Sequence, residues 1–333
     1  MRVMVFDAPH RFVMEERPLP QPADDEVRIR IARVGICGSD LHGYTGESGR
    51  RQPGMVMGHE ASGWVDEIGS RVHGLAIGDL VTFNPTLPCD GSCDHVVPQR
   101  CLRLQVIGIT PELQGAFADA IVVPSNRVVP TQSLSIDQAA TVEPLAVGLQ
   151  VSRRLDVRED DRVLVVGAGM IGQAVAQAAR VDGAEVTLSD LVEGRRRIAT
   201  NAGFDAVGPE FVSDLGPFDG AVDAVGTSVT AEAAIAAVKK GGIICFVGLG
   251  VPEVSIPLFE VVVSERTIVG SFGYTHNIFN EAVSRLRDGE LDVGPLIGDV
   301  VDFDDAPQAF EDLATHARHD VKILVSTGAE PPN

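Results

Sequence analysis

The chain has 333 residues, more than one hydrophobic core usually organises, so two domains are expected. Hydrophobic residues make up 44% of it, but no apolar run approaches the roughly 18 residues that a membrane span needs. The formal net charge of -20 argues against nucleic acid or an anionic membrane as a partner, because like charges repel at long range.

The N-terminal run MRVMVFDAPH lacks the apolar centre of a signal peptide, so a cytoplasmic location is expected. The number of cysteines is odd, and all but one precede residue 102. This distribution favours metal binding or reduced thiols over a disulfide framework. The exception is Cys245, which lies in the apolar run GGIICFVGLG and is interpreted as a buried strand residue.

Residues 1–146 contain short β-type runs, such as VRIRIARVGI, GDLVTF and AFADAIVVP, separated by Gly, Pro and Asp. They predict a mostly antiparallel β domain. From residue 161 apolar strands alternate with helices, which are expected up to 182, over 195–202 and over 231–239. This alternation predicts a parallel, doubly wound sheet in a domain over 147–270, and an α/β protein as a whole.

After residue 270 the pattern predicts helices over 279–288 and 306–314, followed by the terminal strand VKILVS. We expect residues 271–333 to return to the first domain. The domain over 147–270 is then an insertion between two parts of the other.

The run VLVVGAGMIG predicts a dinucleotide-binding turn, because its glycines follow an apolar strand and open a helix at Met170 and Ile171. Gly167 permits the tight turn, and Gly169 lets backbone N–H groups approach a pyrophosphate. Gly172 lets helix and strand pack closely.

Asp190 ends the next strand, EVTLSD, near the position expected for a carboxylate that binds the ribose hydroxyls. Its charge repels a 2′-phosphate, so NAD is expected rather than NADP. The alternative is that Arg195, or the arginines at 196 and 197, hold that phosphate. We also expect Val247 and Gly248, after a later strand, to line the cofactor site.

Candidate metal ligands are scattered upstream of this turn. Cys37 and Ser39 lie in GICGSDLH, His59 and Glu60 in MVMGHEASG, and Glu143 in VEPLAVG. Singly they are ambiguous, because a lone Cys is usually inert and a His–Glu pair is usually a satisfied polar contact. Together with GDLV, AFADAIVVP and VKILV they resemble the zinc-dependent medium-chain dehydrogenase/reductase superfamily, and within it the polyol (sorbitol-like) dehydrogenases.

The resemblance implies a GroES-like β domain, which carries the catalytic zinc, and a Rossmann domain for the cofactor. Cys37 and His59 would be zinc ligands, and Glu60 and Glu143 would supply the third ligand directly or through water. Zinc would make a substrate hydroxyl acidic, and the nicotinamide would accept the hydride. Ser39 would accept the proton first, and His42 would pass it to solvent. Asp40 is interpreted as a structural anchor of its loop.

The sequence departs from the family at a lobe that often holds a structural zinc on four cysteines. Here only Cys89, Cys93 and Cys101 are present. Asp90, Asp94 or His95 could complete the ligand shell, or the lobe has lost its metal. Gly273 stands where polyol dehydrogenases commonly have arginine, which weakens any claim for sorbitol itself. Tyr44 and Phe117 are either walls of the substrate pocket or core residues.

The leading hypothesis is a zinc-dependent and NAD-dependent dehydrogenase of a secondary alcohol, such as a polyol, sugar derivative, cyclitol or diol. Two alternatives are a zinc-free quinone or enoyl reductase and a non-catalytic dinucleotide-binding redox sensor. The full set of metal ligands argues against both. A homodimer or homotetramer is expected by resemblance, and the sequence identifies neither the alcohol nor the direction of the reaction.

Overall fold

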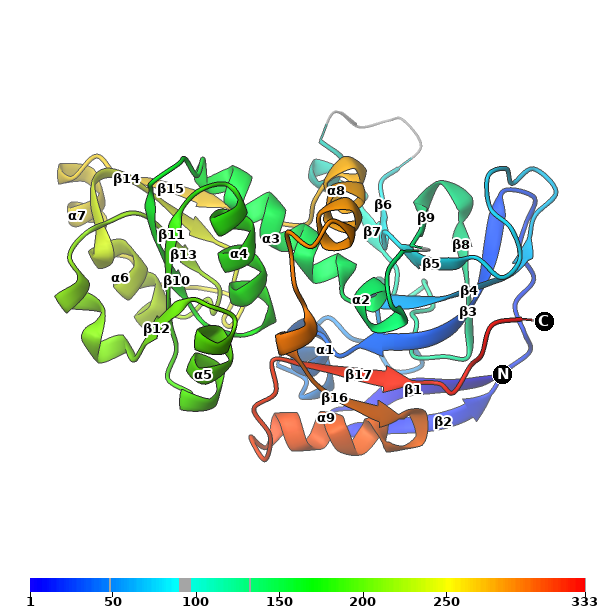
Figure 1. Ribbon diagram of the computed structural model, residues 1–333. Coiled ribbons are helices and arrows are strands. Elements are labelled where there is room, and N and C mark those ends of the chain that lie inside the picture. Colours follow the sequence, from blue (N-terminus) through cyan, green and yellow to red (C-terminus); the bar gives the residue numbers. More distant parts are fainter. Residues whose placement is uncertain (48, 90–96, 132, 333) are drawn as a thin grey trace. The chain divides into compact units, whose positions relative to one another are not determined.

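The structure, a computed structural model, describes residues 1–47, 49–89, 97–131 and 133–332 (Figure 1). The chain folds into two compact units. The first comprises Met1–Glu143, Thr275–Asp288 and Ile297–Asn333, and the second comprises Pro144–Tyr274 and Gly289–Leu296. The domain boundaries after residues 146 and 270 stay a prediction.

One segment groups differently from the prediction. Gly289–Leu296 was expected in the first domain with the rest of 271–333, but it belongs to the second unit. Gln177 explains this grouping, because its side chain donates to the Asp292 carbonyl and accepts from the Asp292 N–H, each at 2.7 Å. Leu291 and Val293 on either side are buried.

The first unit is built on a seven-stranded, mostly antiparallel sheet, in agreement with the predicted class (Figure 1). Its order is β16-β17-β3-β4-β5-β9, and β8 also pairs with β3. The only parallel pair in this sheet, among the described residues, is β16 with β17. The strands are β3 (Glu26–Gly35), β4 (Ala61–Ile68), β5 (Leu80–Phe83), β8 (Ala120–Pro124), β9 (Val128–Pro130), β16 (Ile297–Asp302) and β17 (Lys322–Ser326).

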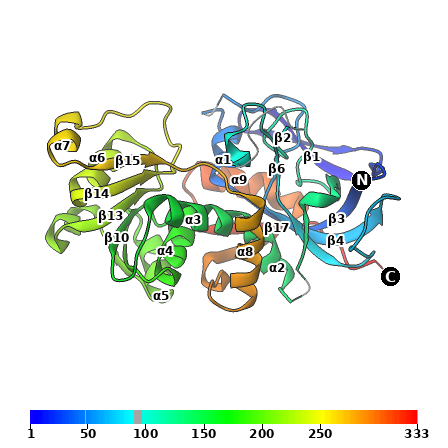
Figure 2. The same ribbon diagram turned by 90° about the horizontal axis from the view of Figure 1, so that it is seen from above.

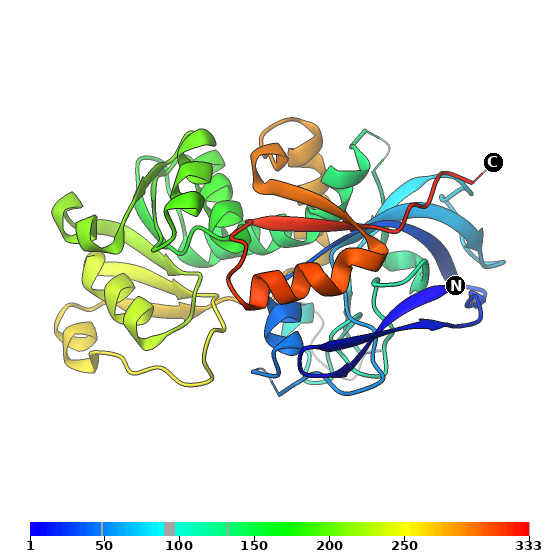
Figure 3. The ribbon, with the colours of Figure 1, turned by 90° about the horizontal axis from the view of Figure 1, so that it is seen from below.

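A hairpin of β1 (Arg2–Ala8) and β2 (Arg11–Glu16) lies alongside α9 (Ala306–Ala314), as Figure 3 shows. Phe12 on the hairpin packs edge to face against Phe310 on α9, with ring centroids 4.9 Å apart. Tyr44 and Phe117 join this aromatic core and are buried, so they are core residues rather than walls of an open pocket. The remaining named elements of the unit are α1 (Gly38–Tyr44), β6 (Thr86–Leu87), β7 (Gln105–Val106), α2 (Ile136–Ala140) and α8 (His276–Arg287).

The second unit is a six-stranded parallel sheet in the order β12-β11-β10-β13-β14-β15, which confirms the predicted doubly wound class. Helices α4 and α5 cover one face, and α6 and α7 cover the other (Figures 1 and 2). Its strands are β10 (Arg162–Val166), β11 (Glu185–Ser189), β12 (Asp205–Val207), β13 (Phe218–Asp223), β14 (Val238–Phe246) and β15 (Thr267–Gly270). Its helices are α4 (Met170–Val181), α5 (Glu193–Asn201), α6 (Ser228–Ala237) and α7 (Leu258–Val263), and α3 (Val142–Leu155) begins at the boundary of the units.

The helix predicted over 231–239 extends too far. Helix α6 ends at Ala237, and the next two residues begin β14. Val238 is β-branched, 1% exposed and paired with Phe218 on β13, so tertiary burial in the sheet overrides the local helical pattern.

Cys245 lies in β14 and is fully buried, as predicted. Burial raises the pKa of its thiol to about 12, so it stays protonated and inert. No helix in the described ranges has the length and apolarity that crossing a membrane requires.

Candidate active site and metal centre

Two neighbouring strands of the first unit bring the metal-ligand candidates together. Cys37 follows the end of β3, and Glu60 directly precedes β4. These antiparallel strands pair Val34 with Ala61, and the Gly35 N–H donates to the Glu60 carbonyl at 2.7 Å. The end of one strand and the start of the other therefore lie at the same edge of the sheet.

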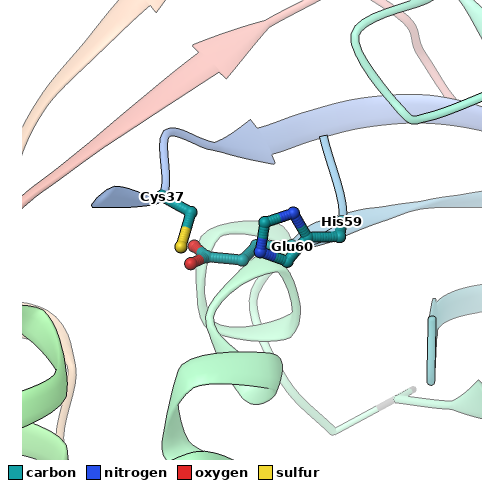
Figure 4. Close-up of side chains that lie close together, drawn as sticks. All are labelled: Cys37, His59 and Glu60. Carbon is teal, nitrogen blue, oxygen red and sulfur yellow. The ribbon is translucent and has the colours of Figure 1, made fainter. Parts of the chain in front are cut away.

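Cys37, His59 and Glu60 point toward one another at this edge (Figure 4). Their sulfur, nitrogen and oxygen ligand atoms all lie within 4.8 Å of one another. Ligands on a tetrahedral zinc are about 3.5 Å apart, as follows from bond lengths of about 2.0–2.3 Å. His59 and Glu60 are 4% and 1% exposed, so these donors form a shielded site.

Asp40 and Arg51 form a buried ion pair beside His59. Arg51 Nη2 lies 3.2 Å from Asp40 Oδ1, and both side chains are almost fully buried. The other carboxylate oxygen of Asp40 lies 3.6 Å from His59 Nδ1, and neither atom has a hydrogen bond to the described part of the chain. The prediction that Asp40 anchors its loop agrees with this pair. Burial lowers the pKa of His59, but Asp40 and Cys37 raise it, with a net result of about 10.

A second buried cation at the site is Lys322, the first residue of β17. Lys322 is 2% exposed, and its Nζ donates to Glu60 Oε2 at 2.5 Å and to the Ile36 carbonyl at 2.9 Å. Burial lowers the pKa of Lys322, but Glu60 and Cys37 raise it above its ordinary value. The amine is therefore a charged member of the site.

In the protonation states that bind a metal, the charged groups of the site fit a divalent cation. With Cys37 as the thiolate and His59 as the neutral imidazole that bind metals, the acidic groups outnumber the basic ones by two charges. Buried charges of one sign are costly unless they are paired or coordinate a metal. The acidic set is Cys37, Asp40, Glu60 and Glu143, and the basic set is Arg51 and Lys322. A zinc ion would balance this excess, and the sulfur, nitrogen and oxygen donors suit it.

Glu143 acts on this site through its charge. It lies in the first turn of α3 and raises the pKa of both His59 and Lys322. It lies outside the group whose ligand atoms are within 4.8 Å of one another. Its role as a ligand stays a prediction.

Ser39 and His42 lie one helical turn apart on α1. Ser39 Oγ donates to Cys37 Sγ at 3.4 Å, so the hydroxyl touches a metal-ligand candidate. His42 is partly exposed, and its Nδ1 lies 2.8 Å from Glu47 Oε2. The imidazole of His42 lowers the pKa of the Glu47 carboxyl. The roles of both residues in proton transfer stay a prediction.

The cysteine lobe is only partly described. The Cys89 N–H donates to Cys101 Sγ at 3.3 Å, which brings two of the predicted ligands together. Cys93 and the alternative ligands Asp90, Asp94 and His95 lie outside the described residues. The structural zinc stays a prediction.

The glycine-rich turn of the second unit links β10 to α4 as predicted. Gly167 has φ 102°, a conformation that favours glycine. A Cβ on Gly172 would lie 1.8 Å from the Gly167 carbonyl oxygen, whereas a Cβ on Gly169 would meet no described atom within 4 Å. Gly169 is the N-cap of α4, and Met170 and Ile171 open that helix, so its free N–H groups face the turn.

Asp190 follows β11 beside this turn. Its carboxylate accepts from the Ala168 N–H at 2.8 Å and from the Val192 N–H at 2.7 Å. Arg195 Nη1 lies 4.0 Å from the same carboxylate, and its buried Nε has no hydrogen-bond partner in the described ranges. Asp190 and Arg195, the acidic and basic candidates for cofactor choice, therefore lie together.

The predicted residues Val247 and Gly248 follow β14, and their N–H groups donate to the Asp223 carbonyl at 3.0 and 2.9 Å. A Cβ on Gly248 would lie 2.3 Å from the Val225 carbonyl carbon. This close backbone approach explains the glycine. The contact of both residues with the cofactor stays a prediction.

Lys322 and Arg51 lie at the site but were not predicted from the sequence. The signal for Lys322 was available, because a lysine within the apolar strand VKILV must be buried or face an edge. Arg51, in a polar stretch of glycine, arginine and proline, carries no comparable signal.

Two family models match the chain. One, described as alcohol dehydrogenase GroES-like domain, matches residues 23–133, and the other, described as zinc-binding dehydrogenase, matches residues 171–288. Among curated proteins, L-idonate 5-dehydrogenase from Vitis vinifera is 34% identical over 320 residues, which cover 89% of this chain and 87% of that protein.

Solved structures share the fold along nearly the full length of the chain. Galactitol-1-phosphate dehydrogenase from Escherichia coli is 28% identical, with a TM-score of 0.89 and coverage of 98% of this chain and 100% of that chain. A structure from Sinorhizobium meliloti 1021 bound to NADP is 27% identical, with a TM-score of 0.90 and 98% of each chain covered.

Proposed function

The chain belongs to the zinc-dependent dehydrogenases that join an alcohol dehydrogenase GroES-like domain to a dinucleotide-binding domain, and we propose that it transfers a hydride between a small polyol-type secondary alcohol and NAD. The observation that carries the proposal is the group of Cys37, His59 and Glu60, whose sulfur, nitrogen and oxygen ligand atoms lie within 4.8 Å of one another. Polyols, sugar derivatives, cyclitols and diols are the substrate classes.

Cys37 and His59 would hold the zinc, and Glu60 and Glu143 would supply the third ligand directly or through water. Bound zinc would supply the Lewis acidity that makes an alcohol hydroxyl acidic, and bound NAD would accept the hydride. The Ser39 hydroxyl, which already touches Cys37, relays the proton that the alcohol loses, accepting it as it releases its own toward His42. His42, which is partly exposed, exchanges that proton with solvent.

NAD is the proposed cofactor because Asp190 directly follows β11, where its carboxylate would repel a 2′-phosphate. A relative that binds NADP and the adjacent Arg195 keep NADP as the alternative. Comparing the affinities for NADH and NADPH decides between the two cofactors.

Homo-oligomerisation is proposed from the second unit. Strand β15 is at the sheet edge, and every residue of α7 beside it is at least partly exposed. Leu258, Phe259 and Val262 on α7 are all more than 60% exposed. An apolar surface next to an open strand edge is typical of an interface between copies of a chain.

The test is metal content per subunit of the purified protein, paired with NAD-dependent oxidation of a panel of polyols, sugar derivatives, cyclitols and diols. We expect chelation to abolish turnover and added zinc to restore it. Two zinc ions per chain would mean that the lobe of Cys89, Cys93 and Cys101 also binds metal, and one would mean that only the catalytic site does. Activity without any zinc would move the chain to the zinc-free reductases and end the proposal.

A further inference from the structure

Lys322 is a buried charge that the chemistry above does not use. Its hydrogen bonds to the described residues go to the Ile36 carbonyl and to Glu60, whose Oε2 lies 2.5 Å from Nζ. Burying an ammonium group is costly, and an apolar side chain could fill the same volume on a strand whose neighbouring residues are apolar. Packing alone therefore does not explain why a charged residue occupies this position.

The sheet fixes where this ammonium group stands. Strand β17 pairs antiparallel with β3, with Leu324 opposite Gly35, and the Ile36 N–H donates to the Ile323 carbonyl at 3.0 Å. This register brings Lys322 to the edge at which β3 leads into Cys37. Lys322 Nζ also donates to the Ile36 carbonyl at 2.9 Å, and this second hydrogen bond holds the amine in place.

The carboxylate of Glu60 is confined as well. A Cβ on Gly35 would lie 2.3 Å from Glu60 Oε2, so the absence of a side chain at Gly35 leaves the room that this oxygen occupies. Lys322 Nζ donates its hydrogen bond to this same oxygen, Glu60 Oε2. The same carboxylate belongs to the group of metal-ligand candidates within 4.8 Å of one another.

We propose that Lys322 is a positioning residue that holds Oε2 of Glu60 and thereby weakens the bond between this carboxylate and the metal. The inference rests on the proposed zinc site. An oxygen that accepts a short bond from an ammonium group has less charge to offer a cation, and the ammonium charge repels the cation directly. A weakly held carboxylate can give up its place on the metal to a substrate hydroxyl.

The test replaces Lys322 with methionine, which fits a buried apolar position, and measures zinc affinity by competition with a chromophoric chelator. Zinc bound at this site is defined as the fraction lost in Cys37→Ser. We expect Lys322→Met to bind this zinc at least about tenfold more tightly and to release it more slowly, because the opposing charge is gone. Lys322→Arg, which keeps the charge, should return the affinity toward that of the wild type.

Two further variants separate this role from a structural one. Arg28→Met removes another buried cation of the same unit, which donates to Asp66 at 2.7 Å, so it should lower the melting temperature without changing zinc affinity. In a Glu60→Gln background, Lys322→Met should change zinc affinity much less than it does in the wild type. The coupling between the two substitutions measures the part of the effect that passes through Glu60.

The outcomes separate the two proposals. Tighter zinc in Lys322→Met, reversed in Lys322→Arg and reduced by Glu60→Gln, supports the positioning role. Unchanged or weaker zinc binding in Lys322→Met, beside a wild type that binds zinc, overturns this inference alone. A wild type that holds no zinc at Cys37 overturns the proposed function and this inference together.

Discussion

At the scale of single residues, surroundings decide which cysteine can bind a metal. Cys37 lies next to Ser39, His59 and Lys322, in a polar, charged cluster. Cys245 is enclosed by apolar side chains, and burial raises the pKa of its thiol to about 12. Cys37 therefore stands among other possible metal ligands, whereas Cys245 stays protonated and does not offer the thiolate that binds zinc.

This contrast gives a prediction. Cys37→Ser should remove the catalytic zinc and lower kcat/KM by roughly 10³-fold or more, because Lewis-acid activation of the hydroxyl is lost. NADH binding, measured by fluorescence titration, should stay close to that of the wild type. Cys245→Ala is the matched control and should keep both zinc and turnover. Substantial activity in a zinc-free Cys37→Ser protein would contradict the assigned role.

Asp190 supports a second prediction at this scale. Its carboxylate accepts two backbone N–H groups and stands near Arg195. Asp190→Ser should weaken NADH binding by about tenfold and improve NADPH binding, because a ribose partner and a repulsive charge are both removed.

Arg195→Ala is the companion variant and should weaken NADPH binding more than NADH binding. Parallel titrations with NADH and NADPH give the ratio of the two dissociation constants for each variant. If wild-type protein bound NADPH more tightly than NADH, the preference for NAD would be wrong.

At the scale of elements, two glycines of the turn between β10 and α4 serve different purposes. Gly172 allows close packing of helix and strand, and Gly169 leaves room for the proposed cofactor. Gly172→Ala would bring a Cβ within 1.8 Å of a backbone carbonyl oxygen, so it should cost about 1–3 kcal/mol of stability and reduce cofactor binding. Gly169→Ala has open space and φ of -73°, so it should fold like the wild type.

If backbone N–H groups approach a pyrophosphate at Gly169, its alanine variant should still bind NADH about tenfold more weakly. Thermal melts and NADH titrations of both variants distinguish the two roles. Full NADH affinity in Gly169→Ala would argue against close approach of the cofactor at this residue.

At the scale of the whole molecule, the apolar surface on α7 conflicts with the strongly acidic composition of the chain. A net charge of -20 keeps molecules apart, yet Phe259 is 75% exposed beside an open sheet edge. Phe259→Asp should therefore shift the mass measured by light scattering from an oligomer toward the monomer. Phe211→Asp, at another exposed phenylalanine of the same unit, is the control and should leave the mass unchanged. A monomeric wild type would refute the proposed assembly.

The sequence alone predicted the class of the fold, the glycine-rich turn between β10 and α4, and the group of Cys37, His59 and Glu60. These features are local: the period of apolar residues, the glycine spacing and short motifs such as GHE depend on neighbours along the chain. Cys245 was identified as buried for the same reason. The boundary of α6 was wrong because Val238 satisfies a helical pattern locally but is buried in the sheet.

Only the tertiary structure decided how these pieces combine. Lys322 meets Glu60 across 262 positions of sequence, through the pairing of β17 with β3 and of β3 with β4. The segment Gly289–Leu296 joined the second unit through Gln177, and Tyr44 and Phe117 proved to be core residues. Each outcome depends on which surfaces are buried against which, and burial is a property of the folded chain rather than of any local run of residues.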